Sequence, residues 1–203
     1  EFISALKYGF LYQGQLYSWQ RQRRGTPTLD LSHKSFVVFL QNHDQVANSL
    51  RGHRIHQLTS PGKLRTLIAL TLLSPGVPML FQGEEFAASA PFLFFADHNA
   101  ELNKLVSKGR AEFLKQFRTI ACEECQALLK EPGEIETFNA CKLDLSEREK
   151  HSEIYDLYRD LLRLRREDHA IRDYKFFDGA VLGECAFLLR YFSGDDRLLL
   201  INL

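Results

Sequence analysis

The chain has 203 residues, of which 45% are hydrophobic and 26% charged, and its formal net charge is +0. These values are typical of a globular protein with a buried core, and the balanced charge argues against binding to nucleic acid or to an anionic membrane. No apolar run has the length of a membrane span, since the longest, residues 64–73, contains Arg65 and Thr66.

The first 35 residues predict a short helix and then a loop. Phe2, Ile3 and Leu6 recur at helical spacing, and the loop is rich in Gly, Gln and Arg. The opening letters, EFISALKYGF, lack the basic segment, apolar core and cleavage site of a signal peptide. The sole methionine is Met79, and the chain stops inside an apolar run. We therefore expect a piece of a longer protein.

Residues 36–41 give the clearest strand signal. The letters FVVFL from residue 36 are apolar without alternation, which predicts a strand buried on both faces of a parallel sheet. The next four residues are Gln41, Asn42, His43 and Asp44. They follow the carboxyl end of the strand, where α/β barrels and open α/β sheets place their chemistry. Residues 44–60 are polar without a period and predict a long loop.

A helix and a second strand follow this loop. Pro61 suits a first helical turn, apolar residues recur at helical spacing up to Leu72, and Pro75-Gly76 ends the helix. Residues 77–81 predict the second buried strand, with the polar letters QGEE at its carboxyl end. Strand, loop, helix and strand together predict a parallel β-loop-α-β unit.

The remainder predicts a long excursion, a long helix and an antiparallel sheet. Residues 86–150 hold the aromatic letters PFLFFADH and a helix that ends near Phe117. Residues 152–167 predict an amphipathic helix whose solvated face carries Arg159, Arg163, Arg165 and Arg166. After residue 172, short β-type runs are separated by Asp-Gly and Ser-Gly turns, which predicts antiparallel strands.

Asp44 is the best catalytic candidate among these residues. A carboxylate at the mouth of a barrel can stabilise the oxocarbenium-like transition state through which a glycosidic bond breaks. Asn42 and His43 beside it can donate hydrogen bonds to sugar hydroxyls. The alternative is that residues 42–44 cap local structure, as Asx residues often do.

Other polar and aromatic residues admit two interpretations. Glu84 and Glu85 are adjacent and cannot flank one bond together, so we favour structure or substrate positioning over catalysis for them. The phenylalanines of PFLFFADH suit either a sugar-stacking platform or packing under a loop. His53 and His56 lack partners at metal-ligand spacing, so we expect surface histidines.

The cysteines predict neither a metal site nor a redox site. Cys122 and Cys125 form a CxxC pattern, while Cys141 and Cys185 stand alone. A zinc site needs a second pair or nearby histidines, and a thioredoxin-like site needs a strand before the CxxC, whereas ACEECQALLK predicts a helix. We expect reduced thiols in a cytoplasmic protein, with no metal and no cofactor.

Several motifs together carry a family resemblance. They are FVVFLQNHDQVAN, SPGVPMLFQGEEFAASAPFLFFADH, GFLYQGQLYSW and FNACKLDLSE, and the match covers most of the chain, residues 8–170. The chain resembles glycoside hydrolase family 13, the α-amylase family, and more narrowly its members that release trehalose from maltooligosyltrehalose. The family usually has Gly where this chain has Ala47, which argues against a positive φ at that position.

The resemblance implies a fold class and a set of roles. Residues 1–171 would be the C-terminal part of a catalytic (β/α)8 barrel, with its seventh and eighth strands, and residues 172–203 the beginning of a C-terminal β-sandwich domain. Asp44 would be the transition-state stabiliser of a retaining hydrolase, and His43 would contact the sugar at the cleavage point. The residues expected to bind substrate beside them are Asn42, Gln45, Asn48 and Glu84.

The rest of the catalytic set is expected outside this chain. The family's nucleophile and acid/base follow two earlier barrel strands, whereas Glu1 and Asp30 are the only carboxylates before Asp44. We therefore expect no hydrolysis by the chain alone. The expected partner is an α-glucan, with self-association through the exposed half-barrel.

Two alternatives remain open at this point. One is another α-glucan enzyme of the same family, a branching or debranching enzyme. The other is a carbohydrate-binding or assembly module without chemistry. Assays of the product separate the first, and measurement of the oligomeric state addresses the second.

Overall fold

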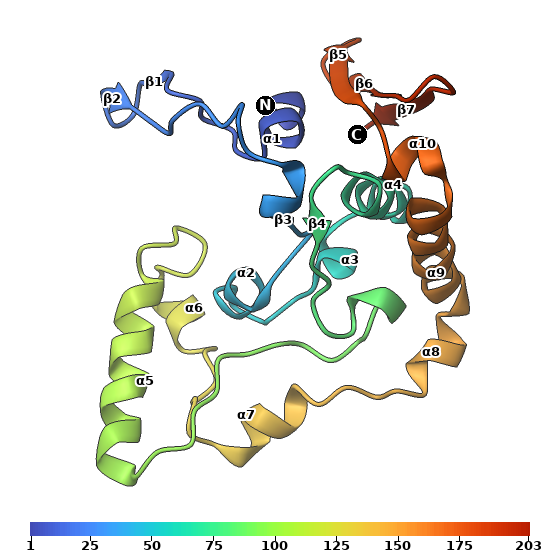
Figure 1. The fold of residues 1–203 in the computed structure, drawn as a ribbon. Coiled ribbons are helices and arrows are strands. Elements are labelled where there is room, and N and C mark those ends of the chain that lie inside the picture. The colour runs from blue at the N-terminus through green and yellow to red at the C-terminus, as the bar shows by residue number, and fades with distance from the viewer. The chain divides into compact units, whose positions relative to one another are not determined.

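A computed structural model describes all of residues 1–203, and its contacts divide the chain into two units. Unit 1 combines residues 1–40, 61–79 and 156–203, and unit 2 combines residues 41–60 and 80–155. Each unit is thus assembled from segments that lie far apart in the sequence (Figure 1).

Unit 1 contains the parallel strand pair, the antiparallel sheet and their helices. In chain order its elements are α1 (Phe2–Tyr8), β1 (Leu16–Tyr17), β2 (Gln22–Arg23), the 3-10 helix η1 (His33–Ser35), β3 (Val37–Val38), α4 (Pro61–Leu72), β4 (Val77–Pro78), most of α9 (Ser152–Glu167), α10 (His169–Arg172), β5 (Phe176–Val181), β6 (Ala186–Phe192) and β7 (Arg197–Asn202).

Unit 2 contains short helices joined by extended chain. In chain order its elements are α2 (His43–Ala47), α3 (Ile55–Leu58), the 3-10 helix η2 (Glu84–Phe86), α5 (Ala100–Leu114), α6 (Glu123–Gln126), α7 (Ile135–Ala140) and α8 (Glu147–Lys150).

The predicted β-loop-α-β unit is confirmed, although its strands are shorter than expected. β3 and β4 pair in parallel, with Val37 opposite Val77 and Val38 opposite Pro78, and α4 connects them. The prediction that the first strand is buried on both faces is wrong, because Val37 is 58% exposed. In a two-stranded sheet each strand is paired along one edge only, and its faces are incompletely covered. Apolar side chains of both strands are therefore exposed to solvent.

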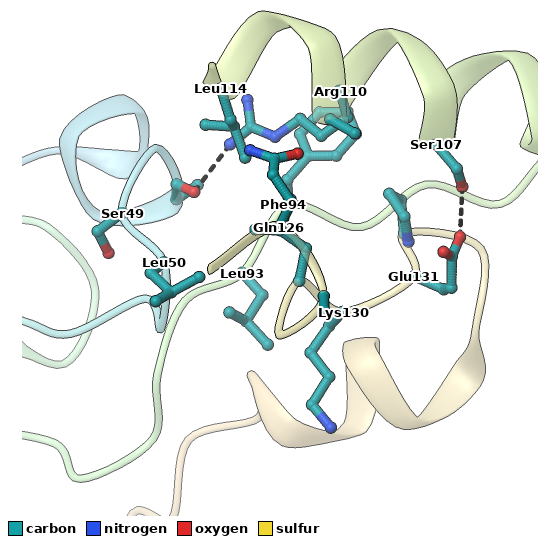
Figure 2. Close-up of a pocket in the computed structure, with 15 residues that line it drawn as sticks. Ser49, Leu50, Leu93, Phe94, Ser107, Arg110, Leu114, Gln126, Lys130 and Glu131 are labelled. Carbon is teal, nitrogen blue, oxygen red and sulfur yellow. Dashed lines mark hydrogen bonds between the residues drawn. The ribbon is translucent and has the colours of Figure 1, made fainter. Parts of the chain in front are cut away.

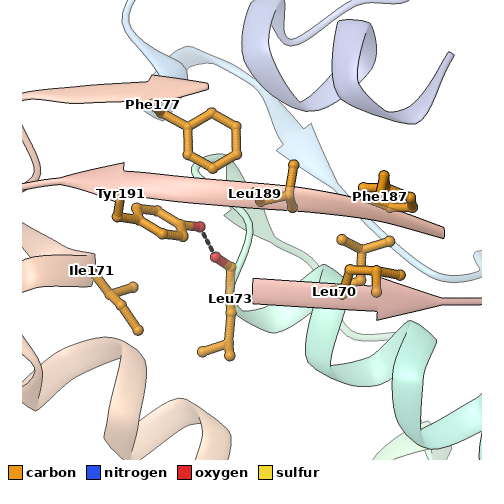
Figure 3. Packing of buried hydrophobic residues seen from close by; sticks show 8 residues of the cluster. Leu70, Leu73, Ile171, Phe177, Phe187, Leu189 and Tyr191 are labelled. Atoms are coloured by element: carbon orange, nitrogen blue, oxygen red, sulfur yellow. Dashed lines mark hydrogen bonds between the residues drawn. The ribbon is translucent and has the colours of Figure 1, made fainter. Parts of the chain in front are cut away.

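The core of unit 1 lies between the antiparallel sheet and the C-terminal part of α4. β6 pairs with β5 on one side and β7 on the other, as the turn signals predict. Alternate residues of β6, Phe187, Leu189 and Tyr191, are buried, which is the period of a strand with one covered face. Figure 3 shows these side chains beside Leu70 and Leu73 of the helix segment. The Tyr191 hydroxyl donates to the carbonyl oxygen of Leu73, and burial raises the pKa of Tyr191.

Arg165 closes the C-terminal end of α4. The last carbonyls of a helix lack partners within the helix. Arg165 Nη1 donates to the carbonyl oxygen of Leu72 over 2.8 Å, and its guanidinium also donates to the carbonyls of Ser74 and Gly76. Placing Arg165 on the solvated face of the long helix was therefore wrong, because its guanidinium is half-buried against these carbonyls and burial lowers its pKa.

Predictions for the other helices were correct where the hydrophobic periodicity extends over many residues. The helices α4 and α9 begin at the predicted Pro61 and Ser152. The long loop predicted for residues 44–60 is wrong in part, because α2 and α3 lie within it. The helix predicted around the CxxC is the single turn α6, and α7 and α8 were not predicted. None of the helices combines the length and apolar composition that crossing a membrane requires.

Replacing Arg165 with Met should destabilise the protein by about 2–4 kcal/mol, because three carbonyls lose charged donors while the apolar stem remains. Urea unfolding measures this change. Arg163→Met, on the exposed face of the same helix, is the matched control and should leave the unfolding midpoint almost unchanged. Equal midpoints for the two variants would contradict the role given to Arg165.

Candidate functional site

The polar residues that follow β3 form a capped helical turn. The Asn42 side chain accepts a hydrogen bond from the Gln45 backbone N–H over 3.1 Å, and the Gln45 side chain accepts one from the Asn42 N–H over 3.0 Å. This reciprocal pair is a capping box, and it satisfies two N–H groups at the start of α2. The local role that the sequence left open for Asn42 is therefore real, and the cap fixes where α2 begins.

The first turn of α2 presents His43 and Asp44 to solvent. Their side chains are 67% and 70% exposed, and His43 Nε2 lies 3.5 Å from Asp44 Oδ1. Because neither side chain is buried, the orientation of the helix decides where both point. An imidazole N–H is a hydrogen-bond donor, so His43 can donate to an oxygen that lies near the carboxylate.

The other end of α2 is held from helix α5. Arg110 Nη2 donates to the carbonyl oxygen of Ala47 over 2.8 Å, the dashed line at Arg110 in Figure 2. Ala47 is the last residue of α2 and is not among the residues with positive φ, so Ala fits the backbone at this position without strain. The backbone N–H of Asn48 donates to the carbonyl oxygen of Asp44 and completes the turn.

A small cavity lies beside this contact. It has a volume of about 240 Å³, and its lining includes Ala47, Phe94, Ser107 and Arg110. Figure 2 shows the Arg110 side chain crossing it from α5 toward α2. Burial lowers the pKa of Arg110, and the negative charge of Asp44 opposes that effect. Arg110, which lines the cavity, is therefore a half-buried cation that interacts with the charge of the candidate carboxylate.

A buried polar network joins the segments that follow β3 and β4. Gln41 Nε2 donates to Glu84 Oε2 over 3.1 Å, and Gln41 Oε1 accepts from the Ile55 N–H over 2.9 Å. Glu84 is 4% exposed and lies in η2, so its carboxylate faces Gln41 in the interior. This arrangement suits a positioning role better than direct proton transfer.

Arg54 ties the same region to the loop that follows η2. It is 0% exposed, and it donates to the carbonyl oxygens of Gln82 over 2.6 Å and Ala90 over 2.7 Å. The guanidinium also lies over the Phe81 ring, 5.2 Å from its centroid. A buried guanidinium needs such partners to offset its desolvation, which lowers the pKa of Arg54.

His56 is not the surface histidine that the sequence predicts. Burial, together with the neighbouring charges of Arg54 and His151, lowers its pKa to about 4. Glu147 acts in the opposite direction on His56, and its own carboxylate accepts from the Ser89 N–H over 2.9 Å. This hydrogen bond lowers the pKa of Glu147.

The phenylalanines of the segment PFLFFADH take part in a series of ring contacts. Phe92 lies edge-on to Phe81 with centroids 5.1 Å apart and to Phe95 at 5.9 Å, and Phe95 contacts Phe138 at 5.1 Å. Phe94 instead meets the Arg110 guanidinium, 4.8 Å from its centroid. These contacts support the packing interpretation of the segment.

Comparison with known proteins gives a consistent result. No family model matches the chain. Malto-oligosyltrehalose trehalohydrolase from Deinococcus radiodurans is 40% identical over 172 residues, 83% of this chain. The enzyme of the same name from Brevibacterium helvolum is 39% identical over 84% of the chain. The crystal structure of a presumed alpha amylase from Salmonella typhimurium superposes on 98% of the chain with a TM-score of 0.82 at 31% identity.

The chain is similar to curated proteins that are all named malto-oligosyltrehalose trehalohydrolase, at 32–40% identity, and its structural neighbours are α-amylase family enzymes. It spans about 28% of the Deinococcus relative and 34% of the Salmonella protein. The predicted fold class, part of an α/β barrel followed by antiparallel strands, is confirmed.

The structure gathers most of the predicted site residues on one short segment. Asn42, His43, Asp44, Gln45 and Asn48 belong to α2 or to its caps. Glu84 joins that segment through Gln41. The catalytic and substrate-binding roles assigned to these six residues remain predictions.

Two arginines of the site were missed from the sequence. Arg54 lies in a polar stretch without a period, and Arg110 lies 63 residues from the carbonyl that it binds. A single sequence carries no local signal for such contacts. The letters KGRAEF predict a helix and give no indication that its arginine reaches another segment.

Asn42→Ala should weaken the start of α2 by about 1 kcal/mol, because the Gln45 N–H loses its acceptor. Amide hydrogen exchange at Gln45 should then accelerate about fivefold, since 1.4 kcal/mol corresponds to tenfold. Asn42→Ser keeps a capping oxygen and should retain most of the protection. Equal acceleration in both variants would show that the cap does not hold the helix.

His56 should make the stability depend on pH between about 4 and 6.5, its folded and unfolded pKa values. Above pH 6.5 both states are neutral and the contribution is constant. Below pH 6.5 His56 binds a proton in the unfolded state but not in the folded state. The unfolding free energy therefore falls by up to about 1.4 kcal/mol for each unit by which the pH is lowered. Urea unfolding at pH 7, 6 and 5 should show this slope.

His56→Gln supplies the control for the pH dependence. The variant keeps a polar side chain but binds no proton in this range, so its stability should change less between pH 7 and pH 5 than that of the wild type. Parallel slopes for the two proteins would rule out His56 as the source.

Proposed function

We propose that the chain is part of a retaining glycoside hydrolase that acts on maltooligosyltrehalose. The enzyme cleaves the α-1,4 bond next to the terminal trehalose and releases trehalose. The observation that carries the proposal is the placement of Asp44, an exposed carboxylate on a capped helical turn that directly follows a parallel strand. The names of the relatives supply the substrate.

Asp44 stabilises the transition state in this proposal. As the glycosidic bond breaks, positive charge develops on the anomeric carbon and the ring oxygen. A carboxylate held in a fixed direction stabilises that charge without reorganising during the reaction. The capping box supports such a fixed direction, because it sets the first turn of α2.

The neighbouring side chains position the sugar. His43 is exposed beside Asp44 and can donate to a sugar hydroxyl. Gln45 uses its side chain in the capping box, so its share in binding is assigned to the remaining donor groups of its amide. Asn48 lies at the C-terminal end of the same turn. Glu84 acts indirectly, through its bond to Gln41.

The nucleophile and the acid/base are assigned to the part of the enzyme that this chain does not cover. The chain spans about 28% of the length of the Deinococcus relative, and only Glu1 and Asp30 precede Asp44 among its carboxylates. A retaining mechanism needs two carboxyl groups about 5 Å apart on either side of the bond. The isolated chain is therefore proposed to be inactive, and its location in the cytoplasm and its self-association remain proposals as well.

Asp44→Asn in a full-length enzyme that contains this chain should lower kcat by several decades with little change in KM, because the lost charge acts mainly in the transition state. Trehalose released from maltooligosyltrehalose is the quantity to measure. Glu101→Gln, an exposed carboxylate in the first turn of α5, is the matched control and should keep wild-type kinetics.

Three outcomes would count against the proposal. An effect of Asp44→Asn on KM alone would refute its role in the transition state. Transferred branches or reducing maltooligosaccharides as the main product would favour a branching or debranching enzyme. Trehalose release by the purified isolated chain, abolished by Asp44→Ala, would refute the division of the catalytic set.

A further inference from the structure

We propose that Arg110 is a positioning residue for Asp44. Its guanidinium holds the C-terminal end of α2 and thereby fixes the direction in which the Asp44 carboxylate points. The inference rests on the proposed function for its catalytic consequence, and on the contacts of Arg110 for its structural part.

Helix α2 is too short to fix its own orientation. It has five residues, and an isolated helix of that length is unstable in water because nucleation costs more than its few hydrogen bonds return. Its N-terminal end is held by the capping box of Asn42 and Gln45. At its C-terminal end the carbonyl of Ala47 has Arg110 Nη2 as its donor, 2.8 Å away. The two ends are thus fixed by two independent groups.

Arg110 is itself held in place by aromatic rings. Its guanidinium carbon lies 4.8 Å from the centroid of Phe94 and 5.6 Å from that of Phe113. Rings at these distances attract a cation and restrict its direction, most strongly where water is excluded. The side chain is half-buried at the cavity shown in Figure 2. A guanidinium in this setting works as a rigid support.

The helix that carries Arg110 is also anchored on both sides of it. Ser107 Oγ donates to Glu131 Oε2 over 2.6 Å, and Leu114 at the end of α5 is 2% exposed. A displacement of Arg110 would therefore require α5 to move against these contacts. The support for α2 reaches back into the fold of unit 2.

The charge of Arg110 acts on the same carboxylate that its geometry supports. The Asp44 charge is among the interactions that oppose the desolvation of Arg110. Any interaction of this kind is reciprocal, so the cation also contributes to the electrostatic field at Asp44. Arg110 therefore acts on the proposed catalytic group in two ways, through its hydrogen bond to α2 and through its charge.

The first test measures kinetics in a full-length enzyme that contains this chain. Arg110→Met keeps the apolar stem and removes the donor and the charge, and it should lower kcat about tenfold to a hundredfold, as small misplacements of catalytic groups do. KM should stay within about twofold of the wild type. Arg110→Lys keeps the charge and should recover part of kcat. Lys108→Gln, exposed on the same helix, is the matched control and should behave as wild type.

A double-mutant cycle separates positioning from general stabilisation. If Arg110 acts through Asp44, Arg110→Met should lower the residual kcat of the Asp44→Asn enzyme less than about twofold, because the group that it positions has already lost its charge. A fall of the same size in both backgrounds would overturn the proposal. So would an unchanged kcat in Arg110→Met.

Hydrogen exchange supplies a readout that does not depend on activity. The Asn48 N–H donates to the carbonyl oxygen of Asp44, so its exchange rate reports whether the turn is closed. Arg110→Met should accelerate it about fivefold or more, and Lys108→Gln should not. Unchanged exchange would refute the structural part of the inference. Accelerated exchange in an enzyme whose Asp44→Asn variant remains fully active would instead refute the proposed function and leave Arg110 as the support of α2.

Discussion

The hydrogen bonds of the buried Arg54 guanidinium are the interaction on which the segments after β3 and β4 depend. It bonds the carbonyls of Gln82 and Ala90 on one side of η2 and the other, while Gln41 bonds Glu84 within the same region. A charge that is removed from water must keep its partners, because losing one costs several kcal/mol. The segments that follow β3 and β4 are therefore held together by these hydrogen bonds, because breaking one would leave the buried charge with fewer partners.

Helix α2 shows how such a framework positions an exposed group. Asp44 makes few contacts of its own that would hold it, so its direction comes from the backbone beneath it. That backbone is fixed by Asn42 and Gln45 at one end and by Arg110 at the other. A site of this kind combines an accessible carboxylate with a rigid support, which is the combination that charge stabilisation requires.

The sequence predicted the elements that have a long hydrophobic period. The helices beginning at Pro61 and Ser152 and the C-terminal antiparallel strands were correct, because their packing faces follow from spacing alone. It missed α2, since five residues are too few for a period, although Asn42 followed three residues later by Gln45 is a capping signature. The seven-residue helix α1 was still visible from its apolar spacing.

Contacts between distant segments were beyond the reach of sequence patterns. The charge of Arg165 in an amphipathic helix predicts a solvated face, yet the side chain bonds carbonyls about 90 residues away. Arg110 reaches Ala47 in the same way. In both cases the acceptor is a backbone oxygen, which every residue type carries, so nothing in the letters marks it.

The use of a backbone oxygen as the acceptor has an evolutionary consequence. Arg110 donates to the backbone carbonyl at position 47, so any residue that adopts a helical backbone there keeps this hydrogen bond. Drift between Gly and Ala at this position is then neutral for the orientation of Asp44, whereas drift at position 110 is not. Selection should accordingly act more strongly on position 110, which lies far away in the sequence, than on position 47, which lies in the same short helix as Asp44.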